Sequence, residues 1–152
     1  MKRIFFLILF SLTLISCSEK KQNVYKVTLV NFNIGIVLKK NHLYLKEYKR
    51  YLTIFSKKNE ELESIKLMED NGTGANSYLY QDKNNYIIID CDGSWYSIDK
   101  KKGNISLIGN FWLKEPPKNY LGTFMLTSDS NKINFVKQEE VKLSDIYKYG
   151  GG

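Results

Sequence analysis

The sequence predicts an all-β protein, in which an antiparallel meander of about nine short strands forms a small barrel or a sandwich. Aromatic residues are frequent, with 11 Tyr and 8 Phe among 152 residues, and together with β-branched residues they favour strands. The apolar runs are short, and turn-forming residues such as those at 56–59, 82–85 and 100–104 separate them. These features indicate hairpins that follow one another along the chain and bury one face of each strand.

The expected strands begin after the polar residues 18–23 and continue almost to the C-terminus. Each is a run of apolar or alternating residues that is bounded by Lys, Asn, Asp or Gly. Eleven segments are candidates for the roughly nine strands: residues 24–32, 34–38, 42–47, 50–55, 61–69, 77–81, 86–90, 95–99, 105–109, 121–127 and 133–136.

Two segments also have features of a helix. Residues 61–69 fit a helix because Leu62, Ile65 and Glu69 would share one helical face, but the neighbouring strands favour a strand. Residues 144–149 fit one short helical turn with a serine as its N-cap.

The N-terminal residues carry the clearest motif in the sequence. Two basic residues, Lys2 and Arg3, precede an apolar stretch at 4–15. This stretch is too short to span a bilayer, which takes about 20 apolar residues, and it has the form of a secretory signal peptide. It leads into Leu-Ile-Ser-Cys at 14–17, which resembles the lipobox of bacterial lipoproteins. The resemblance implies that the Cys17 thiol receives a diacylglyceryl group and that cleavage before Cys17 leaves an acylated N-terminus.

A signal peptide without lipidation, in which Cys17 has no role, is the alternative. The polar residues 18–23 that follow Cys17 suit a flexible tether. Two or three acyl chains would anchor the mature protein to a membrane without spanning it. In Gram-negative lipoproteins that share this motif, a residue other than Asp after the Cys usually permits transport to the outer membrane, and here that residue is Ser18. We therefore expect a lipoprotein of the cell envelope, anchored in the outer membrane and facing the periplasm.

The chain divides into four expected segments. They are a signal peptide at 1–16, the acylated Cys with its tether at 17–23, a single β-rich domain at 24–149 and a flexible tail at 150–152. Loss of the two basic residues in the signal peptide lowers the net charge from +7 to +5. We expect this charge to serve solubility alone, with attraction to anionic lipid headgroups or an acidic partner as the alternative. Short lysine runs lie at predicted turns, and nucleic acid is not an expected partner of an exported, lipid-anchored protein.

The Asp-x-Asp-Gly at 90–93 resembles the nucleophile motif of haloacid-dehalogenase-type phosphatases. That resemblance would make Asp90 the nucleophile and Asp92 the acid/base. The family also needs later catalytic residues on parallel strands separated by helices, whereas strands and turns follow here. A calcium loop that begins at Asp90 would place Trp95 where a glycine is needed. We therefore predict that this segment is the turn of a β-hairpin, because Asp-Gly is a strong turn dipeptide.

The two cysteines predict neither a disulfide nor a reactive thiol. If Cys17 is acylated, Cys91 has no partner. The charges of Asp90 and Asp92 would oppose formation of a thiolate, so we expect Cys91 to be inert.

No residue pattern predicts a catalytic or metal site. His42 is the only histidine, and no serine lies in a Gly-x-Ser-x-Gly elbow. We expect no enzymatic activity, no cofactor and no metal. The leading hypothesis is a binding module, such as an immunity or inhibitor protein that meets a toxin or a hydrolase in the periplasm. The alternatives are a structural accessory lipoprotein of an envelope assembly and a carbohydrate-binding lipoprotein.

Two aromatic residues are candidates for partner binding. Trp95 and Tyr96 are neighbours in one expected strand, so they point to opposite faces, and we expect one in the core and the other exposed. For Trp112 we expect a core position, with a surface anchor as the alternative. Trp112 and Tyr96 are therefore the candidate partner-binding residues, with a protein or a carbohydrate as the partner.

Overall fold

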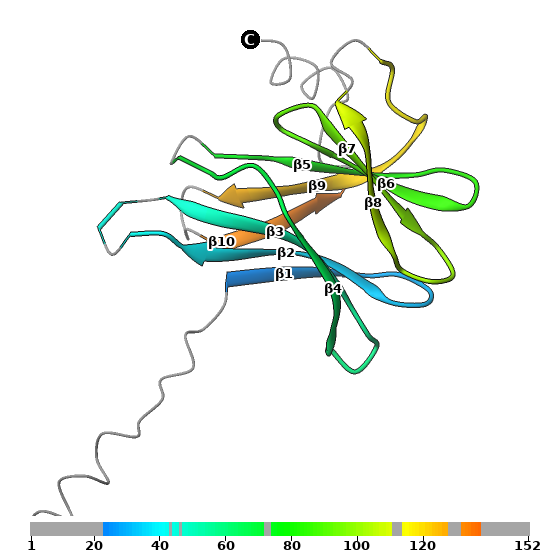
Figure 1. The fold of residues 1–152 in the computed structure, drawn as a ribbon, viewed down its shortest axis with the longest axis horizontal. Coiled ribbons are helices and arrows are strands. Elements are labelled where there is room, and N and C mark those ends of the chain that lie inside the picture. The colour runs from blue at the N-terminus through cyan, green and yellow to red at the C-terminus, as the bar shows by residue number, and fades with distance from the viewer. Residues whose placement is uncertain are drawn as a thin grey trace, which may run out of the picture.

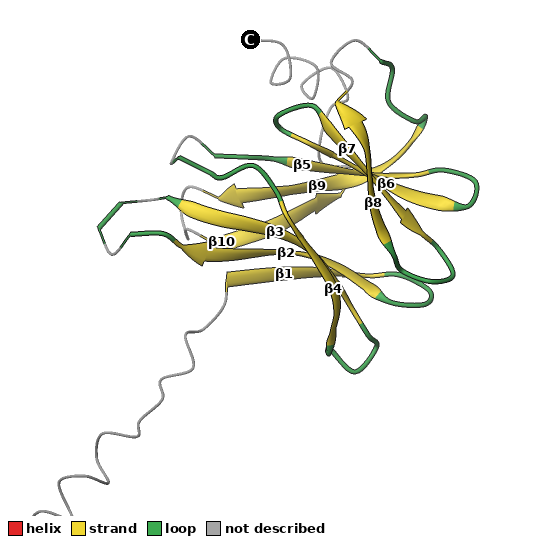
Figure 2. Ribbon diagram, viewed as in Figure 1, coloured by secondary structure: helices red, strands yellow, loops and turns green. Residues whose placement is uncertain are grey.

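The computed structural model describes residues 23–42, 44, 45, 47–71, 74–110, 114–127 and 132–137. In this part of the chain, ten antiparallel strands form two sheets that pack face to face as a sandwich (Figure 1). Loops and turns join the strands, and the described residues contain no helix (Figure 2). These residues therefore include no helix that could cross a membrane. The predicted helical turn at 144–149 lies outside the described residues.

The first sheet is a four-stranded antiparallel meander, and the second is a six-stranded sheet with a rearranged order. The strands of the first are β1 (Asn23–Thr28), β2 (Asn33–Lys40), β3 (Tyr48–Phe55) and β4 (Glu61–Lys66), paired in that order. The strands of the second are β5 (Ser77–Gln81), β6 (Asn85–Asp90), β7 (Ser94–Asp99), β8 (Ile105–Asn110), β9 (Asn119–Thr127) and β10 (Lys132–Lys137). Their spatial order is β10-β9-β5-β6-β7-β8. The chain returns from β8 to pair β9 with β5, so the expected meander is interrupted there.

Side chains connect the two sheets at both open edges. At one edge, the Asn23 Oδ1 atom on β1 accepts a hydrogen bond from the Ile133 N–H on β10 at 3.1 Å. At the other edge, the Glu63 carboxylate on β4 accepts a hydrogen bond from the Ile105 N–H on β8, also at 3.1 Å. The backbone ladders of the two sheets stay separate, so the molecule is a sandwich and not a closed barrel.

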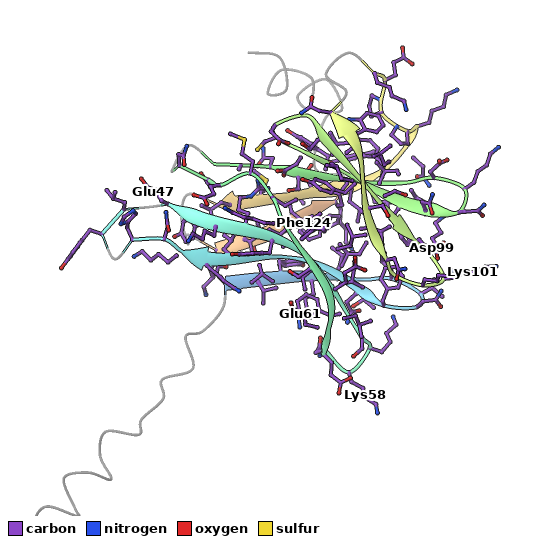
Figure 3. The ribbon with its side chains drawn as sticks, in the orientation of Figure 1. Glu47, Lys58, Glu61, Asp99, Lys101 and Phe124 are labelled. Carbon is purple, nitrogen blue, oxygen red and sulfur yellow. The ribbon has the colours of Figure 1, made fainter. Side chains whose placement is uncertain are left out.

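The main core lies between the two sheets. Alternate residues of the central strands point into it, because successive side chains in a strand face opposite sides. Its fully buried members include Ile34, Ile36, Leu52, Ile54, Leu79, Ile88, Ile98 and Phe124. Figure 3 labels Phe124 between the layers. Removal of this apolar surface from water is the dominant favourable contribution to folding.

A second apolar cluster lies on the outer face of the six-stranded sheet. Its buried members are Tyr78, Tyr80, Ile87, Trp95 and Tyr120. The ring centres of Tyr80 and Tyr120 lie 5.3 Å apart, a separation typical of favourable aromatic pairs. The Lys114 ammonium lies 5.1 Å from the centre of the Trp95 ring, within the range of a cation–π contact. The outer face of this sheet is therefore buried at these positions.

Trp95 and Tyr96 show the effect of this second cluster. They point to opposite faces of β7, as predicted, but both are buried, with 4% and 6% of their surface exposed. Trp95 belongs to the outer cluster and Tyr96 to the main core. The expectation that one of the two is exposed is wrong, because both faces of this sheet are covered.

Most of the predicted strands are confirmed, but the one at 24–32 is shorter than expected. β1 ends at Thr28, and the Leu29 N–H then donates a hydrogen bond to the Phe32 carbonyl at 3.0 Å. This contact closes a tight turn, after which the Phe32 side chain enters the core. The segment 61–69 does contain a strand, β4, as predicted.

The strand predicted at 42–47 is wrong. The Asn41 N–H donates a hydrogen bond to the Glu47 carbonyl at 2.9 Å, which closes a loop between β2 and β3. Within this loop, Tyr44 is 95% exposed and Leu45 is 52% exposed. The side chains of Tyr44 and Leu45 therefore do not face the core.

Candidate functional site

The Asp-x-Asp-Gly motif forms the tight turn between β6 and β7. The Gly93 N–H donates a hydrogen bond to the Asp90 carbonyl at 2.9 Å. Gly93 has a φ of 79°, a left-handed conformation that favours glycine. The Asp92 carboxylate accepts hydrogen bonds from the N–H and the hydroxyl of Ser94, each at 2.9 Å. These contacts confirm the predicted hairpin and give Asp92 a local structural role.

Asp90 is the buried partner of an arginine on the other sheet. Two hydrogen bonds join the Arg50 guanidinium on β3 to the Asp90 carboxylate on β6, at 2.8 and 3.1 Å. The Ser77 hydroxyl on β5 donates to Asp90 at 2.7 Å and accepts a hydrogen bond from Arg50 at 2.5 Å. Arg50, Asp90 and Ser77 are 1%, 2% and 0% exposed. We call these three residues the inter-sheet ion cluster, because they connect both layers of the sandwich.

The Arg50 guanidinium is nearly saturated with partners. Its Nη1 atom also donates to the Met68 carbonyl at 3.2 Å and to the Cys91 sulfur at 3.6 Å. The Nε–H has no hydrogen-bond partner among the described residues. Burial acts to lower the pKa of Arg50, but the charge of Asp90 and its hydrogen bonds outweigh burial and raise the pKa. Arg50 therefore stays charged inside the sandwich.

The inter-sheet ion cluster has the chemistry of a structural element. Both carboxylate oxygens of Asp90 accept hydrogen bonds, and the side chain has almost no contact with solvent. A nucleophile must approach its substrate to hydrogen-bond distance, which this position does not permit. In the part of the chain that the structure describes, no group of three or more His, Cys, Asp or Glu side chains could hold a metal ion. The motif thus contributes an ion pair and a turn to the fold.

Cys91 lies beside the inter-sheet ion cluster and is partly buried. The pKa of its thiol is raised to about 11, first by burial and then by the charge of Asp90, while the charge of Arg50 acts in the opposite direction. Since only the thiolate is a strong nucleophile, the thiol is unreactive at neutral pH. This agrees with the prediction that Cys91 is inert.

The remaining residues considered in the sequence are dispersed. Tyr96 lies in the main core. His42 is exposed in the loop between β2 and β3, where its Nε2 atom lies 3.4 Å from the Glu47 carboxylate. Cys17 and Trp112 lie outside the described residues.

An open basic pocket lies at the end of the six-stranded sheet where β5 turns into β6. Its volume is about 450 Å³. The lining residues come from the β5–β6 turn, the β7–β8 turn and the segment that leads into β9: Gln81, Asp82, Lys83, Lys100, Pro117, Lys118 and Asn119. The pairing of β9 with β5 places Asn119 opposite Gln81 and so brings the third segment to the pocket. Three lysines and one aspartate give the pocket a positive charge.

Lys100 holds two turns of this pocket together. Its ammonium group donates hydrogen bonds to the carbonyl oxygens of Asp82 and Lys83, the second at 3.0 Å. Its backbone N–H donates to the Asn84 carbonyl at 3.1 Å. The ammonium also lies 5.2 Å from the centre of the Tyr86 ring. The position of Lys100 is therefore fixed by the β5–β6 turn.

The β7–β8 turn presents two further lysines. The Asp99 carboxylate accepts hydrogen bonds from the backbone N–H groups of Lys101 and Lys102, at 2.8 and 2.7 Å. The bond from Lys102 and then the bond from Lys101 lower the pKa of Asp99. Gly103 completes the turn with a φ of 74°. Figure 3 shows Asp99 and Lys101 at this end of the sandwich, and the side chains of both lysines are exposed.

We define the basic end as Lys83, Lys100, Lys101, Lys102 and Lys118. The salt bridges found in the described ranges involve none of these five lysines. The carboxylates of the same segments are Asp82, Asp99 and Glu115, and Asp99 is engaged by backbone N–H groups. The sequence predicts lysines at solvated turns, but it does not predict the pocket, which depends on the long-range pairing of β9 with β5.

The chain matches no protein-family model, no curated protein and no solved structure. Its class is therefore defined by its architecture: a two-sheet antiparallel sandwich with a buried ion pair between the layers and a basic pocket at one end.

Proposed function

We propose that this protein is a membrane-anchored bacterial lipoprotein whose β domain acts as a non-catalytic binding module. Its partner is a toxin or a hydrolase that reaches the periplasm, so the protein serves as an immunity protein or an inhibitor. The observation that carries the proposal is Leu-Ile-Ser-Cys at 14–17, which follows a basic N-terminus and a short apolar stretch. This motif implies export and acylation of Cys17, and Ser18 after it favours the outer membrane, facing the periplasm.

The described domain supports binding in preference to catalysis. The two carboxylates that resemble a phosphatase motif both have structural partners, since Asp90 pairs with Arg50 and Asp92 bonds to Ser94. The Cys91 thiol is protonated at neutral pH because its pKa is raised to about 11. Among the described residues, no salt bridge neutralises the lysines of the basic end, and such a charge suits recognition of an acidic surface.

The survival of cells exposed to a toxin tests this function. We expect deletion of the gene to sensitise cells to siblings that secrete a toxin encoded next to it. The wild-type gene should restore survival, whereas Cys17→Ala, which cannot be acylated, should restore less. Equal survival with and without the gene, against the toxin encoded beside it, would contradict the immunity role.

A structural role in an envelope assembly is the second candidate, and strand β8 favours it. This strand lies at the end of its sheet, and its Leu107 and Ile108 side chains are 58% and 46% exposed. An end strand can pair with an extended segment of a partner. This role predicts co-purification with envelope components and no toxin sensitivity after deletion. Carbohydrate binding has less support, because Tyr96 is buried.

A further inference from the structure

We infer that the basic end is the surface through which this protein binds an acidic face of a protein partner. The inference rests on the proposed function, because it supplies the recognition surface of the binding module. Three observations carry it: the unpaired lysine charge, the size and chemistry of the pocket, and the position of this end relative to the start of β1.

The charge of the basic end is not neutralised within the described domain. Its lysines are exposed or half-buried, and the described carboxylates form no salt bridge with them. Asp99, which is adjacent in sequence, instead accepts hydrogen bonds from backbone N–H groups. By contrast, Lys66 pairs with Glu69 at 2.7 Å. An uncompensated cluster of like charges attracts an acidic surface and fixes its orientation.

The pocket has the size and the donors to receive a carboxylate side chain. Lys83 and Lys118 line it from different segments, and the amides of Gln81 and Asn119 add further donors. An ammonium group has three donors. Lys100 uses two hydrogen bonds on backbone carbonyl oxygens, so one donor remains for a ligand. A volume of about 450 Å³ accommodates an Asp or Glu side chain from a partner.

The basic end lies far from the residue at which β1 begins. The strand starts at Asn23 and has six residues, which extend over roughly 20 Å. In the turn that follows, the Asn31 side chain donates a hydrogen bond to the Lys100 carbonyl at 2.7 Å. Figure 1 shows the start of β1 on the left and the β5–β6 and β7–β8 turns on the right.

This placement favours a protein partner over lipid headgroups. The tether from Cys17 to Asn23 reaches at most about 20 Å when fully extended. The membrane therefore lies nearer to the Asn23 end of the sandwich. The basic end is directed away from it, toward the space in which a soluble partner arrives.

Binding to poly-L-glutamate tests the inference. The full chain is purified from its producing cells in a neutral detergent, and its affinity for the polymer is measured at about 0.1 M salt, where surface charges are partly screened. Lys83→Glu/Lys118→Glu changes the basic end. Lys39→Glu/Lys49→Glu makes the same change in net charge at the opposite end of the sandwich. We expect the first variant to lose roughly tenfold or more in affinity and the second less than about threefold.

Several results would overturn the inference. One is an equal loss of affinity for poly-L-glutamate in the two variants, which would show an effect of net charge alone. Another is no measurable binding of the polymer by the wild-type chain. A preference for phosphatidylglycerol over phosphatidylcholine vesicles that only Lys83→Glu/Lys118→Glu removes would assign this end to the membrane instead. Thermal unfolding checks that both variants fold. Lys83→Gln/Lys118→Gln is a milder change, for which we expect a smaller loss of affinity in the same direction. The assay does not require acylation of Cys17. A result that overturns the role of the basic end is therefore separate from a result that overturns the lipid anchor.

Discussion

The Arg50 guanidinium and the Asp90 carboxylate form a two-point ion pair inside the sandwich, with nitrogen–oxygen distances of 2.8 and 3.1 Å. The two residues are 40 positions apart in the sequence and lie on different sheets. The pair therefore exists only when the two layers are packed. Because removal of a charge from water is unfavourable, each member depends on the other for its stability in the interior.

Loss of the Asp90 charge should destabilise the protein strongly. Asp90→Asn leaves the buried Arg50 guanidinium without its counter-charge, and we expect the free energy of unfolding to fall by about 3–5 kcal/mol. Unfolding in urea measures this change. The double variant Arg50→Met/Asp90→Leu should lose less free energy of unfolding than Asp90→Asn, because it leaves no buried charge. A double variant that is less stable than the single one would contradict this account of the pair.

The close contact between β9 and β10 predicts a large effect at Gly122. A Cβ atom there would lie 2.4 Å from the Val136 carbonyl oxygen and 2.5 Å from the Phe135 ring, at a φ of 149°. We expect Gly122→Ala to destabilise the fold by roughly 1–3 kcal/mol or more, as overpacking does. Gly74 is the matched control, because its φ is 83° but no atom lies within 4 Å of the added carbon. If urea unfolding shows equal losses of stability for Gly122→Ala and Gly74→Ala, the close packing of β9 against β10 at Gly122 is wrong.

The Cys91 thiol should become reactive only at high pH. Because its pKa is raised to about 11 in the folded protein, the rate of alkylation by iodoacetamide should rise with a midpoint near that pH. In urea the same thiol should titrate near its ordinary value of about 8.5. The folded state binds the thiol proton more tightly than the unfolded state does. The contribution of this proton to the free energy of unfolding is therefore complete below the unfolded-state pKa, and it is lost as the pH rises through the folded-state pKa. A folded-state midpoint below that of the unfolded chain would contradict the burial of this thiol.

The local part of the fold could be predicted from the sequence. The hairpin at 90–93 was predictable because a turn depends mainly on the residues within it, here Asp92 and Gly93. The strand at 61–69 was favoured over a helix by its neighbours. The loop at 42–47 has the same alternating pattern as a strand, but the hydrogen bond between Asn41 and Glu47 closes a loop there, and Tyr44 is exposed.

The long-range part of the fold and the candidate site could not be predicted in this way. Arg50 stands at the start of the apolar run 50–55, but its burial and its pairing with Asp90 depend on how two sheets pack. The basic pocket depends on Asn119 lying opposite Gln81, which follows from the return of β9 to β5. Both features join segments that are far apart in the sequence, and no local pattern encodes such pairings.

Intact-mass spectrometry of the protein from the membrane fraction of its producing cells tests the lipid anchor most directly. The account predicts a chain that begins at Cys17 and carries two or three acyl chains on that residue. Cys17→Ala should lack this added mass and should leave the membrane fraction or keep its signal peptide. A mature chain with an unmodified Cys17, or a cytosolic form that retains its initiator methionine, would contradict it.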